Sequence, residues 1–472
     1  MKKIKVTTTA KEMLADIYTP VAIYLRLRDR FRDTILLEST DNSAAENSYS
    51  FIGVNAIAGI EVSEKGYLES KLPAQPAEKL QLKGGEDVKK LLWNFMERFE
   101  MEELSRKELQ FAQGLFGYFT FEAVQFFEKI KFKPAADDIN NIPIARYRLY
   151  QYVIAINHHK DELLLLENEV TGVESEAAVV ESLIKSKDVP TFPFSTSGTE
   201  TSNMADQEYI AMVNKSIQSC FRGDVFQIVV SRRFQQSFIG DEFNVYRALR
   251  HINPSPYLFF FDYGDYKLLG SSPEAQLIVR DGKAIVHPIA GTFPRSGNDA
   301  IDESKATELL ADAKENAEHI MLVDLARNDL SKVCSDVQVS SFRQVKYYSH
   351  VIHLVSEVTA NVPEGTNPFE LLSSTFPAGT LSGAPKYKAM QLINEYEPTP
   401  RSFYGGAIGF VGFNGSCNKA IMIRTMLSKS NTLVYQAGAG VVAASKPVNE
   451  LQEVNNKLNA LKSALVKATT IK

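Results

Sequence analysis

The chain has 472 residues, 44% of them hydrophobic and 23% charged, and its formal net charge is −5. That balance is typical of a globular protein, and the acidic charge argues against an electrostatic nucleic-acid binder. No apolar run reaches the length of a membrane-spanning helix, and the basic N-terminus lacks the apolar segment of a signal peptide, so we expect a cytoplasmic protein that contacts neither membrane nor nucleic acid.

The three cysteines, Cys220, Cys334 and Cys417, are spread along the chain without a C-x-x-C spacing. This pattern excludes a cysteine-based zinc site and a disulfide framework, and it fits a reducing compartment. None of the three has the strand–turn–helix context in which a glutaminase holds its nucleophile.

Hydrophobic periodicity and turn residues predict alternating strands and helices along the chain. In chain order these are strands at 34–39 and 49–62, a helix at 86–99, a hairpin over 150–167, helices at 174–185 and 209–220, the latter capped by Gly223, a strand at 225–231, and hairpins that turn at Asp281-Gly282, Asn414-Gly415 and Ser430-Asn431. Segment 186–206 is rich in Ser, Thr and Pro and lacks periodicity, which indicates a linker. We therefore predict an N-terminal region, 1–195, and a C-terminal region, 205–472.

The repeated hairpin signals favour an α+β fold with large antiparallel β-sheets over a doubly wound parallel sheet. Two glycine-rich stretches, 379–386 and 437–440, were candidates for nucleotide-binding loops. Neither matches the spacing of a P-loop or of a dinucleotide-binding motif. A nucleotide-binding protein is therefore disfavoured.

Two pairs of glutamates have an i, i+3 spacing on predicted helices. Glu315 and Glu318 precede an apolar run at 320–326, whose helix we expect to be buried, and Glu450 and Glu453 border the apolar stripe of a C-terminal helix. Like charges at this spacing repel, and partly buried carboxylates need a cation or a proton. A Mg²⁺ ion between the pairs would satisfy both, although spacing alone favours two solvated acidic patches.

A series of ordered motifs carries a family resemblance. The motifs are PIAGTFPR (288–295), AEHIMLVDLARND (317–329), FPAGTLSGAP (376–385), YGG (404–406), AIMIRT (420–425), QAGAGVV (436–442) and ELQEVNNK (450–457). In this order they resemble the chorismate-utilising enzymes, which include anthranilate, aminodeoxychorismate, isochorismate and salicylate synthases. The resemblance is dense over 205–472 and thinner through LLES (36–39) and YSFIG (49–53). It implies large antiparallel β-sheets packed face to face with helices outside.

The resemblance also implies a site for chorismate, which carries two carboxylates and an enolpyruvyl ether. In the family, four glutamates hold Mg²⁺ on the ring carboxylate, where the ion neutralises charge and withdraws electrons. A tyrosine and an arginine hold the enolpyruvyl carboxylate, and small residues approach the ring and the carboxylates. The matching positions are Glu315, Glu318, Glu450 and Glu453 for the metal, Tyr404 and Arg424 for the enolpyruvyl carboxylate, and Gly291, Thr292, Gly438 and Gly440 for the remaining contacts.

Catalytic roles are implied for three further residues. Glu274, in the motif SSPE, matches the general acid that protonates the departing C4 hydroxyl, so we expect its pocket to raise its pKa. His353 matches the histidine linked to loss of the C2 proton, and Thr380 is expected to orient it. On sequence alone, Glu274 would be a turn residue and His353 a core histidine, and His350 competes with His353 for the same role.

Two positions discriminate among family members. Relatives that add water at C2 carry a lysine base at the position of Gln227, which we expect to contact the substrate. Aminodeoxychorismate synthases commonly carry a nucleophilic lysine at the position of Ala290. Both residues favour direct attack by ammonia followed by release of pyruvate, as in the large subunit of anthranilate synthase. The alternatives are an aminodeoxychorismate-forming subunit and a tryptophan-sensing subunit with a degenerate site.

The same resemblance implies a source of ammonia and a feedback inhibitor. A separate glutamine amidotransferase subunit would supply ammonia, unless the enzyme uses free ammonia alone. Tryptophan is expected to bind where a carboxylate, polar groups and an apolar slot meet. The matching positions are Glu38, Ser39, Ser50, Pro256, Tyr257 and Leu258. The alternative for the turn at 253–257 is a purely structural role, in which its two prolines lead the chain into a strand.

Overall fold

The computed structural model describes residues 3–39, 48–83, 87–104, 106–133, 139–348 and 351–471. The elements up to residue 185 are β1 (Ile4–Leu14), α1 (Pro20–Leu27), β2 (Thr34–Glu38), β3 (Tyr49–Val62), β4 (Tyr67–Lys71), β5 (Glu78–Gln81), α2 (Val88–Met96), β6 (Phe99–Met101), η2 (Lys107–Ala112), β7 (Gly114–Phe119), η3 (Phe121–Phe126), β8 (Ala145–Asn157), β9 (Glu162–Glu169) and α3 (Ala177–Lys185). The later elements are β10 (Phe194–Ser202), α4 (Asp206–Phe221), β11 (Gln227–Gly240), α5 (Phe243–Ile252), β12 (Tyr257–Asp262), β13 (Tyr266–Ser272), β14 (Ala275–Arg280), β15 (Lys283–Val286), β16 (Ile289–Pro294), α6 (Asp299–Ala311), α7 (Ala313–Ser331), β17 (Ser335–Tyr347), β18 (Val351–Asn361), α8 (Pro368–Thr375), α9 (Gly379–Ser382), β19 (Gly383–Ala384), α10 (Lys386–Tyr396), β20 (Ala407–Gly412), β21 (Cys417–Ile421), β22 (Thr425–Lys429), β23 (Thr432–Val441) and α11 (Pro447–Ala468).

Two arms of antiparallel sheet diverge from the long strand β8. One arm runs β8–β3–β2–β12–β13–β22–β23–β11–β10. The other runs β8–β7–β20–β21–β14–β15–β18–β17. Because β2 pairs with β12 and β7 pairs with β20, strands from the two halves of the sequence lie side by side in both arms.

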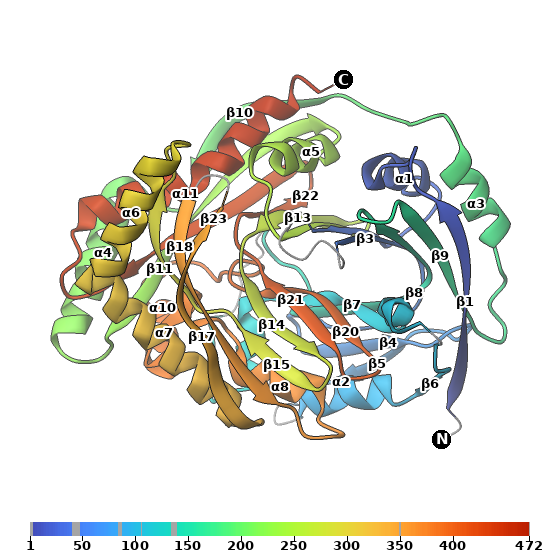
Figure 1. Cartoon of the computed structure of the whole chain (residues 1–472), viewed down its shortest axis with the longest axis horizontal. Helices are drawn as coiled ribbons and strands as arrows, with labels where there is room; N and C mark the ends of the chain where they lie inside the picture. The colour runs from blue at the N-terminus through green and yellow to red at the C-terminus, as the bar shows by residue number, and fades with distance from the viewer. Residues whose placement is uncertain are drawn as a thin grey trace.

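The two arms face each other across buried apolar side chains. One cluster joins Phe261 and Leu268 of the first arm to Phe116 and Phe410 of the second. Helices α1 and α3 lie outside the strands near β1 and β9, and α4, α7, α10 and α11 lie outside them at the opposite end (Figure 1). This arrangement confirms the predicted α+β class with large antiparallel sheets. No described helix combines the length and the apolar character needed to cross a membrane.

The predicted linker at 186–206 was wrong in part, because β10 lies inside it. Strand β10 pairs antiparallel with β11, opposite residues 234–240. Of its side chains only Phe194 is buried, so the strand is held by backbone hydrogen bonds and has no apolar alternation to reveal it. The three predicted hairpins are confirmed, two of them with two-residue turns and the one at Asn414-Gly415 with a loop that also includes Phe413. The turns Asp281-Gly282 and Ser430-Asn431 have positive φ at both residues, as a type I′ hairpin requires.

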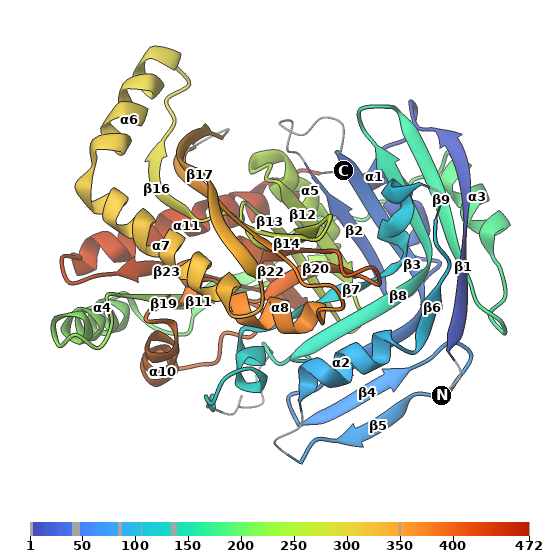
Figure 2. The same cartoon turned by 60° about the horizontal axis from the view of Figure 1, so that its bottom comes forward.

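The prediction that the helix over 320–326 is buried all round was also wrong. Helix α7 packs against β16, β17 and β18 and against α8 and α9, and the rest of its surface is exposed. Leu322, Val323 and Ala326 are buried in these contacts, whereas Ile320 is 45% exposed. Figure 2 shows α6 and α7 along the outer edge of the molecule, which explains why the far face of α7 lacks a cover.

A buried ion pair ties several of these elements together. Arg401, 1% exposed, binds Glu397 at the end of α10 through two hydrogen bonds of 2.8 and 2.6 Å. It also donates to the carbonyl oxygens of Leu381 in α9 and Val229 in β11. Glu397 in turn accepts from the backbone and the hydroxyl of Ser231. One guanidinium therefore fixes α9, α10 and β11 relative to one another.

Replacing Arg401 should destabilise the fold strongly. Arg401→Met leaves the Glu397 carboxylate buried without its cation, and we expect the free energy of unfolding to fall by about 3–5 kcal/mol. Urea unfolding followed by circular dichroism measures this change. As a matched control, Lys215→Met breaks the exposed Lys215–Glu395 pair and should change stability by less than about 1 kcal/mol. Equal urea midpoints for Arg401→Met and the parent chain would contradict the prediction.

Candidate active site

Helices α7 and α11 bring the two predicted glutamate pairs near each other. Burial raises the pKa of Glu315, and the charges of Glu318 and Glu453 raise it further. Burial and the charge of Glu453 likewise raise the pKa of Glu450. Charges on two helices distant in sequence therefore repel across the site. Within the described part of the chain, no three His, Cys, Asp or Glu side chains have converged into a ligand cluster.

The start of β11 supplies Gln227, which lies beside the glutamates and the glycines of β23. Its Nε2 donates to Glu318 at 2.7 Å. A Cβ atom at Gly440 would lie 2.6 Å from this Nε2, and one at Gly438 would lie 3.1 Å from the Tyr404 hydroxyl. Because these contacts leave no room for a side chain, glycine at both positions keeps the backbone of β23 open beside Gln227 and Tyr404.

Strands β16 and β18 place Gly291 and His353 next to each other. The His353 Nδ1 lies 2.9 Å from the carbonyl oxygen of Gly291, which can only accept, so Nδ1 carries the proton and Nε2 is the basic nitrogen. Burial lowers the pKa of His353, which keeps the ring neutral near pH 7. The Thr292 backbone pairs with His353, but the Thr292 side chain and all of His350 lie outside the described residues.

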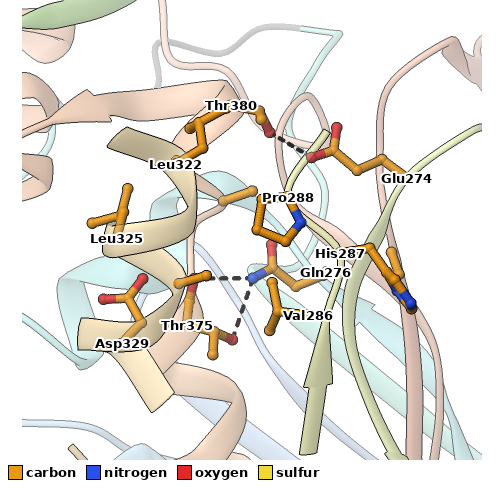
Figure 3. A pocket seen from close by; sticks show the side chains of 14 residues that line it. Glu274, Gln276, Val286, His287, Pro288, Leu322, Leu325, Asp329, Thr375 and Thr380 are labelled. Carbon is orange, nitrogen blue, oxygen red and sulfur yellow. Dashed lines mark hydrogen bonds between the residues drawn. The ribbon is translucent and has the colours of Figure 1, made fainter. Parts of the chain in front are cut away.

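Glu274 lies in the connection between β13 and β14, opposite α9 (Figure 3). Its Oε1 accepts a 2.8 Å hydrogen bond from the Thr380 hydroxyl. Burial raises the pKa of Glu274 to about 7, while this hydrogen bond and the charges of Lys457 and Arg424 act to lower it. The predicted rise is confirmed. Thr380 was expected to orient His353. Its hydroxyl instead donates to Glu274, because α9 begins over the β13–β14 connection.

Arg424 stands between the two arms with a left-handed backbone, at φ 48°. Its charge acts on both Glu274 and His353, which places the guanidinium near both side chains. Among the described residues, the Arg424 side chain donates to one acceptor, the amide oxygen of Asn253, at 3.3 Å. A largely buried guanidinium with donors to spare is suited to bind an anion. Such a strained backbone at a non-glycine residue is typical of functional sites.

Lys457 is a site residue to which the sequence analysis assigned no role. Its Nζ donates to the carbonyl oxygen of Gly438 at 2.9 Å and lies 2.8 Å from Glu453. The signal was present in the sequence, because Lys457 follows Glu453 by four residues and therefore lies on the same face of α11. Its position next to Gly438 depends on how α11 packs on β23, which no local pattern reveals.

The predicted inhibitor positions gather at the pairing of β2 with β12. Leu258 lies opposite Glu38, whose carboxylate accepts from Tyr246 at 2.6 Å and from Arg250 at 2.9 Å. Ser50 contacts His158 at 2.7 Å. Ser39 follows β2 directly, and Pro256 and Tyr257 lead into β12. A cavity of about 460 Å³ adjoins this cluster, lined by Tyr18, Thr19, Pro20, Val21, His158, Arg247, Arg250 and Ile471.

Comparison with known proteins connects this geometry to one family. Residues 60–463 match the family of chorismate binding enzymes. The chain is 36% identical to the anthranilate synthase component 1 of Aquifex aeolicus over 96% of this chain and 93% of that protein, and 35% identical to that of Mycolicibacterium smegmatis over 99% and 92%. The crystal structure of anthranilate synthase component I from Streptococcus pneumoniae superimposes with a TM-score of 0.75 at 30% identity, covering 96% of this chain and all of that one. The menaquinone-specific isochorismate synthase of Escherichia coli shares the fold, with a TM-score of 0.75 at 17% identity over 98% of this chain and 95% of that one.

The protonation state of Glu274 should depend on Thr380. Glu274 is expected to titrate near pH 7, being protonated below and ionised above that value. Thr380→Val removes a hydrogen bond that stabilises the carboxylate, so it should raise the pKa of Glu274 further. Infrared difference spectra of the carboxyl band, assigned with Glu274→Gln, follow this titration. Thr366→Val, at an exposed turn far from the site, serves as the control. A Glu274 that is fully ionised at pH 5 would contradict the prediction.

Proposed function

The chain belongs to the family of chorismate-binding enzymes, and we propose that it is the chorismate-converting component of an anthranilate synthase. In this reaction ammonia adds at C2 of chorismate, the C4 hydroxyl leaves, and elimination of pyruvate then gives anthranilate, the first step of tryptophan biosynthesis. The observation that carries the proposal is Gln227. Its amide nitrogen donates a hydrogen bond to Glu318, and an amide cannot act as the base that a water-adding relative needs.

Substrate binding is assigned to the groups around Arg424. Its guanidinium and the Tyr404 hydroxyl are proposed to hold the enolpyruvyl carboxylate, and the open backbone at Gly438 and Gly440 supports the approach of a carboxylate to the strand. Lys457 adds a second cation at Gly438. Together these groups fix the ring relative to Glu274 and His353.

Proton transfers are assigned to Glu274 and His353. Glu274, protonated near neutral pH, gives its proton to the C4 hydroxyl, which leaves as water while ammonia bonds to C2. The neutral His353 then takes the C2 proton on Nε2, the electron pair of the C–H bond enters the ring, and the enolpyruvyl C–O bond breaks. Aromatisation drives this second step. The two pKa values are displaced so that one group is an acid and the other a base at the same pH.

Mg²⁺ is the proposed cofactor, with Glu315, Glu318, Glu450 and Glu453 as its holders. The donor chemistry fits, because repelling carboxylates on α7 and α11 raise the pKa of Glu315 and Glu450, and a hard cation relieves that repulsion. When bound, the ion would neutralise the ring carboxylate of chorismate. Water molecules are expected between the ion and some of the carboxylates, since Mg²⁺ releases its waters reluctantly.

Ammonia is proposed to come from a glutamine amidotransferase subunit. None of the three cysteines has the properties of a glutaminase nucleophile, because burial raises the pKa of Cys220, that of Cys334 to about 11 and that of Cys417 to about 12. The relatives are named component 1, which agrees with a second component. Ala290, in β16, offers no nucleophile for the aminodeoxychorismate alternative.

Feedback inhibition by tryptophan is proposed at the β2–β12 cluster. A regulatory ligand there would reach the substrate site over a short path, because Asn253 precedes Tyr257 by four residues and its side chain contacts Arg424. Leu258 is paired with Glu38 of β2 on one side and with Ser271 of β13 on the other. The backbone N–H of Ser271 donates to the Arg424 carbonyl oxygen. A ligand that contacts Glu38 or the turn at 253–257 could therefore shift Arg424, the arginine that is proposed to hold chorismate.

The purified chain should form anthranilate from chorismate, Mg²⁺ and excess ammonium, and EDTA should abolish the product. Fluorescence measures anthranilate directly, and the mass of the product distinguishes it from aminodeoxychorismate or isochorismate. Glu318→Gln and Glu453→Gln should each raise the Mg²⁺ concentration for half-maximal rate at least about tenfold, by loss of a carboxylate. The exposed Glu303→Gln in α6 is the control. Unchanged Mg²⁺ dependence in both site variants would refute the metal assignment, and chorismate consumed without anthranilate would refute the reaction.

Tryptophan inhibition should be separable from catalysis. Ser39→Phe fills the space beside Glu38 and should abolish inhibition while activity is kept, and Pro256→Ser should weaken inhibition by loosening the turn. The rate of anthranilate formation at increasing tryptophan concentration measures both effects. Ser186→Phe, in the segment between α3 and β10, is the control for adding an aromatic ring. Unaltered inhibition in both Ser39→Phe and Pro256→Ser would contradict the proposed tryptophan site.

A further inference from the structure

A cavity of about 40 Å³ adjoins Glu274 on the side facing α7 (Figure 3). Strand β14, the segment 286–288, helix α7 and the segment 375–380 enclose it. A water molecule needs roughly 10–15 Å³ of such space and polar partners to hold it. The cavity is therefore large enough for one or a few waters, and its use depends on the polar groups in its wall.

Gln276 supplies the first of these groups and is 2% exposed. Its Nε2 donates to the Thr375 carbonyl oxygen at 3.0 Å and to the Thr375 Oγ1 at 3.3 Å. A carbonyl can only accept, and the Thr375 hydroxyl already donates to Leu372, so the nitrogen must be the atom that faces Thr375. The amide oxygen, whose orientation is thereby fixed, accepts no hydrogen bond from any described residue. A buried carbonyl oxygen without a donor is unfavourable, which points to a ligand with an N–H or O–H group.

The far wall of the cavity leads toward solvent. Asp329, on α7, is 4% exposed and pairs with Lys386 at 2.5 Å and with Lys332 at 3.0 Å. The Lys332 side chain is 46% exposed. Figure 3 shows Gln276 projecting between β14 and α7, with the Glu274–Thr380 hydrogen bond beyond one end of it and Asp329 across the cavity. Asp329 and Lys332 therefore connect the wall of the cavity to the protein surface, while Val286, Leu322, Leu325 and Ala326 make much of the remaining wall apolar.

We propose that this cavity is a water site behind the general acid, and that its water returns a proton to Glu274 after each turnover. The inference rests on the proposed function, in which Glu274 gives its proton to the C4 hydroxyl and is left as a carboxylate. The cavity water, oriented by the Gln276 amide oxygen, then donates a proton to that carboxylate. In the same transfer this water takes up a solvent proton that enters past Asp329, so no hydroxide remains in the cavity. His353 releases the proton that it took from C2 to solvent, and the enzyme thereby regains its starting charge. Chorismate covers the opposite side of Glu274, which is why the proton arrives from behind.

The water itself can be tested without any reference to activity. A high-resolution crystal structure of the full chain should show an ordered water within hydrogen-bond distance of the Gln276 amide oxygen, and the water should be lost in Gln276→Leu. A dry cavity in the parent chain would overturn the inference whether or not the protein makes anthranilate. Failure of the proposed function would instead appear as a parent chain that forms no anthranilate while the water is present.

The proton-return role is tested by kinetics with the full chain. Gln276→Leu should lower kcat at least about tenfold with little change in KM for chorismate, since proton delivery rather than binding is impaired. The D2O effect on kcat should increase, and added imidazole, a small proton donor, should restore part of the rate. Gln236→Leu, a buried glutamine of β11 that donates to backbone carbonyls far from the site, is the matched control and should keep the parent kcat. A lowered kcat with an unchanged D2O effect and no response to imidazole would overturn the relay.

Discussion

The buried pair of Arg401 and Glu397 is the interaction on which the site geometry depends. Its hydrogen bonds reach β11, the end of α10 and the carbonyl oxygen of Leu381, the residue after Thr380. The guanidinium also lies 5.6 Å from the ring centre of Tyr404. A charge taken out of water is tolerated only when all its partners are in place, so this pair selects one arrangement of these elements. Tyr404, Thr380 and the start of β11 are positioned together as a result.

Around that frame, the proposed acid Glu274 and the proposed base His353 lie in buried surroundings that displace their pKa values. Glu274 is enclosed and holds its proton to about pH 7, whereas burial favours the neutral ring of His353. The same physical effect, removal of water from a charged form, therefore moves the two groups in opposite directions. Arg424 and Lys457 lie close enough to oppose the rise at Glu274, which limits it to the range where proton release is still possible.

The strand pairing between β2 and β12 joins the N-terminal region to this chemistry. Glu38 pairs with Arg250 and accepts a hydrogen bond from the Tyr246 hydroxyl, so its carboxylate already has partners within the chain. An amino acid that binds there must share or replace those contacts. Since the turn before β12 carries Asn253, whose amide oxygen accepts a hydrogen bond from Arg424, a change at the cluster has a direct structural route to the arginine that is proposed to bind substrate. The cluster lies in the first sheet arm, which also carries Gln227 and Gly438, whereas His353 belongs to the second arm and Arg424 connects the two.

The sequence by itself determined the fold class and the hairpin turns, because turn chemistry and hydrophobic periodicity are local properties of the chain, and its ordered motifs predicted the candidate side chains of the site through a family resemblance. It also predicted the raised pKa of Glu274 from the demands of the chemistry. The tertiary structure alone decided that β10 is a strand, that α7 is covered on only part of its surface, and that Thr380 contacts Glu274. It also brought Lys457 to Gly438 and Asn253 to Arg424. Each of these depends on contacts between segments far apart in sequence, where backbone pairing and burial, rather than local pattern, decide which groups meet.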